Sequence, residues 1–128
     1  MSASGSPPNN PTARGELEPG PHPIVGDVYS VASRAYAVIQ KRESHPAVVL
    51  SPIAGTDEWN VWVRTSQLDR PGIDHAPDRS LRLERRGRFC GRDIARLPSH
   101  VFMDPDLAEH RGTLDAETFK KLMDWWLA

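Results

Sequence analysis

Polar side chains that could do chemistry flank two short apolar segments of the chain. His45 opens the first segment, and Arg64, Thr65 and Ser66 follow the second. An imidazole can act as acid or base near neutral pH, a guanidinium stays charged, and a hydroxyl can hydrogen-bond to an anion. Because polar groups at a strand end are held by a rigid scaffold, these four residues are the candidates for chemistry.

The elements that position these candidates are predicted to be short strands. Residues 47–50 are aliphatic and lie between prolines, which favours a strand buried on both faces. Further strands are predicted at residues 26–31, 36–39, 58–63, 80–84, 88–90 and 94–102, with loops at 68–78 and 104–109. Many short strands indicate a mainly β fold, a small closed or partly closed barrel.

The C-terminal end is predicted to be a helix. Asp115 is the expected N-cap. The helix should carry an apolar stripe at helical spacing, formed by Phe119, Leu122, Met123 and Trp126. This stripe should lie across an open side of the barrel. Trp125 should point away from it and be partly exposed or placed at an oligomer contact.

The N-terminal residues 1–23 differ in composition from the rest. They hold six of the twelve prolines and almost no aliphatic residues. Such a segment cannot bury enough apolar surface to offset its ordering entropy, so we expect a disordered tail and one domain over residues 24–128. The tail lacks the features of a secretory signal, and no later run is long enough to cross a bilayer. We therefore expect a cytoplasmic protein without a membrane partner.

Cysteine and histidine usage indicates neither a disulfide nor a metal site. Cys90 is the single cysteine, which fits a reducing compartment. The five histidines lack the spacing of a zinc site, and Asp104, Asp106 and Glu109 lack the glycine turn of an EF-hand-like loop. No metal or other cofactor is expected.

The charges are segregated along the chain although the net charge is only −1. Residues 79–96 hold seven arginines against two acids, about plus five, while residues 104–128 are acidic. Arginine forks suit phosphate and base contacts, so the block is a plausible footprint for a nucleic acid. A solvated β-ribbon with outward arginines explains the block equally well.

Four segments in the right order resemble the MazF/PemK family of toxin endoribonucleases. They are Gly-Asp-Val-Tyr-Ser-Val at 26–31, His-Pro-Ala-Val-Val-Leu-Ser-Pro at 45–52, Arg-Thr-Ser-Gln at 64–67 and Arg-Gly-Thr-Leu at 111–114. The resemblance implies an SH3-like barrel with a C-terminal helix, usually a homodimer. It also implies cleavage of single-stranded RNA without metal, by attack of the 2′-hydroxyl on the adjacent phosphate, and neutralisation by a cognate antitoxin peptide.

The same resemblance assigns roles to residues of this chain. His45 stands where the family has a catalytic arginine, and it would act as general acid or base. Thr65 aligns with the family threonine and would hold a phosphate oxygen, while Arg64 would supply the missing cation. The residues expected to bind RNA are Arg34, Arg42, Ser66, Arg82, Arg85, Arg86, Arg88 and His100.

A second interpretation stays open beside the first. His45 could be a strand-edge histidine bonded to backbone, and Thr65 could satisfy backbone groups where its strand ends. The chain would then be a barrel of the same fold without cleavage activity, and it would bind a nucleic acid or a peptide.

Overall fold

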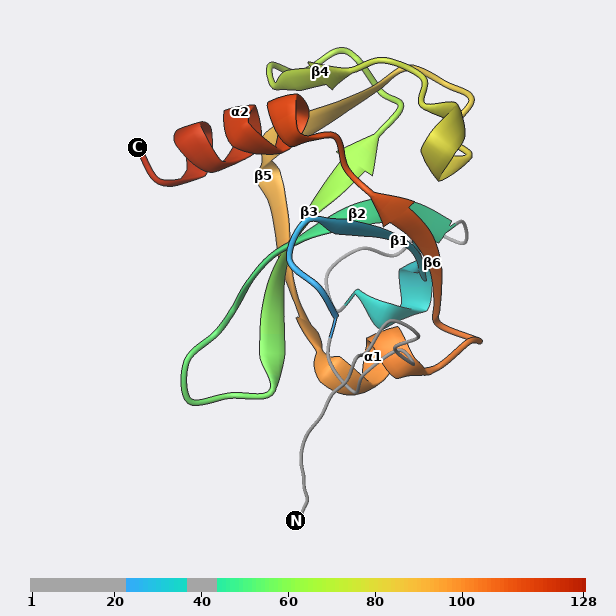
Figure 1. Cartoon of the computed structure of the whole chain (residues 1–128), viewed down its shortest axis with the longest axis vertical. Helices are drawn as coiled ribbons and strands as arrows, with labels where there is room; N and C mark the ends of the chain where they lie inside the picture. The colour runs from blue at the N-terminus through green and yellow to red at the C-terminus, as the bar shows by residue number, and fades with distance from the viewer. Residues whose placement is uncertain (1–22, 37–43) are drawn as a thin grey trace.

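The computed structural model describes residues 23–36 and 44–128, which form a curled antiparallel sheet with a C-terminal helix (Figure 1). The six strands follow the order β4-β5-β3-β2-β1-β6 and make a half-barrel. The mainly β prediction is confirmed. The elements are β1 (Asp27–Ala32), η1 (Ser33–Ala35), β2 (Ser44–Pro52), β3 (Glu58–Thr65), β4 (Ile73–His75), η2 (Arg79–Leu81), β5 (Gly87–Pro98), α1 (Ser99–Met103), β6 (Ala108–Thr113) and α2 (Ala116–Trp126), where η marks a 3₁₀ turn.

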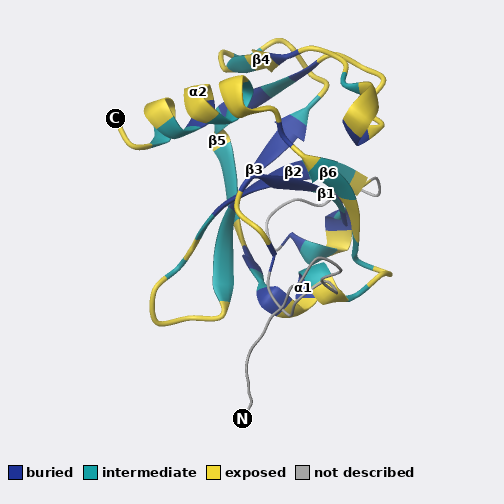
Figure 2. Ribbon diagram, in the orientation of Figure 1, coloured by how far each residue is buried: buried dark blue, intermediate teal, exposed yellow. Residues whose placement is uncertain are grey.

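Strand β2 is buried on both faces, as the sequence predicted (Figure 2). Val48 and Leu50 belong to one apolar cluster, which α2 covers through Leu122. Ala47 and Val49 belong to a second cluster on the other face, which α1 covers through Val101. The side chains of β2 alternate between two cores, so the sheet is the middle layer of the domain.

Helix α2 begins as predicted. The Asp115 carboxylate accepts a hydrogen bond of 2.8 Å from the Thr118 amide. Leu122 is fully buried, and its stripe partners pack against the first cluster. Trp125 is 53% exposed, as expected, but it does not point away from the core, because its ring centroid lies 5.3 Å from that of Trp62.

Two predicted strands are replaced in part by helical turns. The strand predicted at 80–84 is wrong, because the Asp78 side chain caps the turn η2 and Arg82 adopts a left-handed conformation after it. The strand predicted at 94–102 ends at Pro98, and α1 follows. Here the Ser99 hydroxyl donates to the Asp57 carbonyl and accepts from the Trp59 indole, which turns the chain.

One strand, and the start of another, lie in segments predicted as loops. β4 occupies residues 73–75 of the loop predicted at 68–78, and β6 starts inside the loop predicted at 104–109. Both are edge strands, and each gains its pairing from a distant partner, β5 or β1. Residues 1–22 of the predicted tail, the strand at 36–39 beyond Tyr36, and Arg42 lie outside the described residues.

No helix in the described part of the chain has both the length and the apolar character needed to span a membrane.

Replacing Leu122 tests whether α2 is part of the core. Leu122→Ala should lower the free energy of unfolding by about 2–5 kcal/mol, because it removes a fully buried side chain and leaves a cavity. The exposed neighbour Lys121→Ala should change it by less than about 0.5 kcal/mol. Urea titrations would measure both, and equal effects would contradict this packing.

Candidate functional site

Two of the predicted site residues lie at facing strand ends. In the antiparallel pair of β2 and β3, Ala47 is opposite Val63, so the same register two residues on sets His45 opposite Thr65. Both are half-buried, and their position in the strand alternation puts them on the face of the second cluster. The Thr65 hydroxyl accepts a hydrogen bond of 3.0 Å from the Gln67 amide.

Arg64 directly precedes Thr65 on β3, so its side chain points to the opposite face of the sheet. The residue is 5% exposed. Its Nε donates to Nδ1 of His75 at 2.8 Å, and its Nη2 donates to the carbonyls of His75, Ala76 and Arg85 at 3.2, 3.5 and 2.7 Å. Burial lowers the pKa of the guanidinium. Because these donors are used inside the protein, the geometry does not suit the phosphate-binding role predicted for Arg64.

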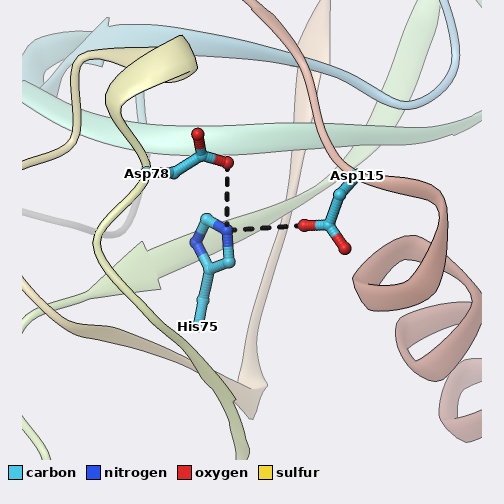
Figure 3. A group of neighbouring side chains, drawn as sticks. All are labelled: His75, Asp78 and Asp115. Carbon is cyan, nitrogen blue, oxygen red and sulfur yellow. Dashed lines mark ion pairs between the residues drawn. The ribbon is translucent and has the colours of Figure 1, made fainter.

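His75 also faces two carboxylates. Its Nε2 lies 3.6 Å from Asp78 and 3.8 Å from Asp115 (Figure 3). This group could hold a metal ion by spacing alone. However, Arg64 donates to Nδ1, so the proton of the neutral ring stands on Nε2, and Nε2 then offers no lone pair to a metal. The donor set therefore does not fit a metal ion.

The same cluster joins the caps of two helical elements. The other Asp78 oxygen accepts from the Ser80 amide at 3.0 Å, at the start of η2. The other Asp115 oxygen accepts from the Thr118 amide, at the start of α2. Through His75, Arg64 is thus connected to both caps. Burial, and next the charge of Arg64, lower the pKa of His75.

A second histidine–carboxylate pair lies at the opposite edge of the sheet. Asp27 is 5% exposed, and its two oxygens lie 2.8 Å from His110 Nε2 and 2.9 Å from the Thr113 hydroxyl. The half-exposed His110 ring stacks at a tilt against Tyr29, with centroids 5.1 Å apart. A buried carboxylate that orients a half-exposed imidazole can support proton transfer.

Sequence reasoning missed this pair, because its two residues are 83 positions apart in the chain. The signal that could have found it is the pairing of the first and last strands, which brings Asp27 opposite Thr113. That pairing joins residues 86 positions apart and leaves no local pattern.

The arginine block is partly neutralised in the fold. Arg82 lies 3.6 Å from Glu109, Arg86 lies 3.6 Å from Asp74, and Arg88 lies 2.6 Å from the same carboxylate. Arg88 also donates to two backbone carbonyls and is half-buried. Arg85 is exposed, and we find no ion pair for its side chain in the described part of the chain. The positive charge that this block offers to a ligand is therefore smaller than its number of arginines suggests.

The remaining predicted RNA-binding residues are spread over the surface. Arg34 is exposed and donates to the Asp106 carbonyl at 2.9 Å. Ser66 is exposed after β3, and His100 is exposed on α1. The structure brings His45 and Thr65 to one place, whereas Arg34, Ser66 and His100 lie in η1, after β3 and in α1.

The chain matches no protein-family model and no curated protein.

Substituting Arg64 tests its internal role. Arg64→Ala should lower the free energy of unfolding by roughly 3 kcal/mol or more, because several buried acceptors lose their donor. Arg96→Ala removes an exposed arginine paired with Glu58, and it should cost less than about 1 kcal/mol. Denaturant titration would compare them. A small effect of Arg64→Ala, similar to that of Arg96→Ala, would contradict the internal role.

The low pKa of His75 predicts a pH dependence of stability. The folded state favours the neutral ring, so this contribution is complete above the ordinary histidine pKa of about 6.5 and is lost as pH falls below it. The free energy of unfolding should therefore drop more steeply between about pH 7 and pH 5 in the wild type than in His75→Gln. Urea titrations at both pH values would measure this. Parallel profiles would contradict it.

Proposed function

We propose that the protein is a toxin-like endoribonuclease of the MazF/PemK kind, which cleaves single-stranded RNA without metal. The fold would be the SH3-like barrel of that family. In this proposal the protein works in the cytoplasm as a homodimer and is neutralised by a cognate antitoxin peptide. The four sequence segments and the curled sheet with its C-terminal helix support the proposal.

The observation that carries the proposal is the facing position of His45 and Thr65 at the ends of β2 and β3. RNA cleavage by the 2′-hydroxyl needs a group that takes or gives a proton and a donor for the phosphate oxygens. His45 would move the proton. The Thr65 oxygen already accepts a bond from Gln67, so its own hydrogen is available to donate to a phosphate oxygen.

In this proposal the cation for the phosphate charge comes from a residue other than Arg64. The guanidinium of Arg64 is committed to His75 and to backbone carbonyls. Arg42 precedes His45 by three residues, so it is the candidate that the sequence offers. In this proposal Arg42 takes the role first expected of Arg64.

The burial of Arg64 also favours a second candidate function. Without a charged fork beside His45 and Thr65, the barrel would bind a nucleic acid or a peptide and leave RNA intact. This candidate predicts the same fold, and activity separates the two.

Incubation with single-stranded RNA in EDTA tests the first candidate. The wild type should produce cyclic-phosphate or 2′/3′-phosphate ends, and His45→Ala and Thr65→Ala should each lower the rate by roughly 100-fold or more. Thr118→Ala, which removes a hydroxyl on α2, should cut like the wild type. End-group analysis of labelled RNA would measure the products.

Two outcomes would change the assignment. Intact RNA that binds with a salt-sensitive affinity would favour the second candidate. Cleavage that is lost in His110→Ala but kept in His45→Ala would move the chemistry to the Asp27–His110 pair.

A further inference from the structure

Strand β5 has an edge that no described strand covers for most of its length. β4 pairs with β5 only through Ile73, Asp74 and His75, which face residues 87–89. β5 continues to Pro98, and in the described ranges 23–36 and 44–128 no other strand pairs with that side. Figure 1 shows β5 running on well past the short β4. Main-chain amide and carbonyl groups along that side can pair with an added strand, apart from the Cys90 carbonyl, which accepts a hydrogen bond of 2.7 Å from the Trp62 indole.

A groove lies beside the start of β4, where the uncovered edge of β5 begins. Its volume is about 610 Å³, and it is lined by Pro71, Ile73, Phe89 and Trp125, with Arg70 and Arg92 as charged members. A groove of this size and mostly apolar lining can take one or two side chains of a ligand.

Trp125 is held in place as one wall of the groove. Its ring packs on the ring of Trp62 and lies directly over Gly91, where a Cβ atom would overlap the indole. Yet half of the Trp125 surface is exposed, and Leu127 beside it is 72% exposed. An ordered aromatic wall with open surface is typical of a preformed recognition site, because little side-chain freedom remains to be lost on binding.

The charge at the groove favours an acidic ligand. Arg70 is 3.7 Å from Asp93 and is thereby partly neutralised. Arg92 is exposed, and in the described part of the chain we find no ion pair for it. Its fork is therefore available to a carboxylate.

We propose that this surface binds an extended acidic peptide of a partner protein, which adds as a strand beside β5. One apolar side chain of the peptide would enter the groove against Trp125, and a carboxylate would reach Arg92. An open strand edge offers main-chain donors and acceptors, which a peptide backbone matches and a nucleic acid does not. The groove offers one available guanidinium, that of Arg92, whereas binding of a polyanion depends on several cationic contacts to phosphates. Only the identity of the partner rests on the proposed function.

Selection from a phage-displayed library of random peptides tests the proposal on the full chain. The enriched peptides should alternate apolar residues with acids and bind at least tenfold more weakly to Trp125→Ala and to Arg92→Glu. Arg79→Glu, at an exposed arginine on η2, is the matched control and should bind like the wild type. Hydrogen exchange should show new protection of amides in residues 90–96 with a bound peptide, but not with its proline-substituted version.

Each remaining outcome would overturn the proposal. These are the absence of enriched peptides, peptides that bind Trp125→Ala equally well, and displacement of the peptide by a single-stranded oligonucleotide. A dimer that Trp125→Ala converts to a monomer, measured by light scattering, would assign the surface to a second copy of the chain. An RNA-cleavage assay of the same variants keeps the two proposals separate, since Trp125→Ala can lose the peptide in a protein that cuts RNA or in one that does not.

Discussion

The hydrogen bonds of the buried Arg64 guanidinium hold together β3, β4 and the segment before β5, and this part of the domain depends on them. The Arg64 side chain starts on β3, bonds to the side chain and carbonyl of His75 on β4, and reaches the Arg85 carbonyl in the segment before β5. That segment and β4 contribute Leu81, Leu83 and Ile73 to the first apolar cluster, and the guanidinium adds hydrogen bonds that tie the two segments to β3. Gly87 allows the approach, because a Cβ at this position would overlap the guanidinium.

This use of Arg64 changes how the sequence should be interpreted. An arginine next to a threonine at a strand end resembles a phosphate-binding pair, but strand alternation sends neighbouring side chains to opposite faces. Thr65 therefore shares a face with His45, and Arg64 turns into the protein. The same alternation that brings two predicted site residues together removes the third from them.

The parts of the fold that the sequence predicts well are those with a local signal. β2 is a proline-bounded aliphatic run, and α2 has an N-cap followed by an apolar stripe. The parts it does not predict depend on distant partners. β4 and β6 are short polar edge strands that exist because β5 and β1 pair with them, and the Asp27–His110 contact follows from the second of these pairings. The alternation of apolar and polar residues at 80–84 predicts a strand wrongly, because the Asp78 side chain caps a helical turn there and the backbone follows that turn.

The two proposed surfaces lie on opposite faces of the sheet but are connected through it. His45 and Thr65 share the face of the second cluster, whereas Trp125 packs on Trp62, which belongs to the first. A peptide in the Trp125 groove would not cover His45 directly. It would instead contact Phe89, whose strand partner is Arg64, the residue next to Thr65. Control of the chemistry by such a peptide would therefore have to pass through the position of β3, which the Arg64 network holds.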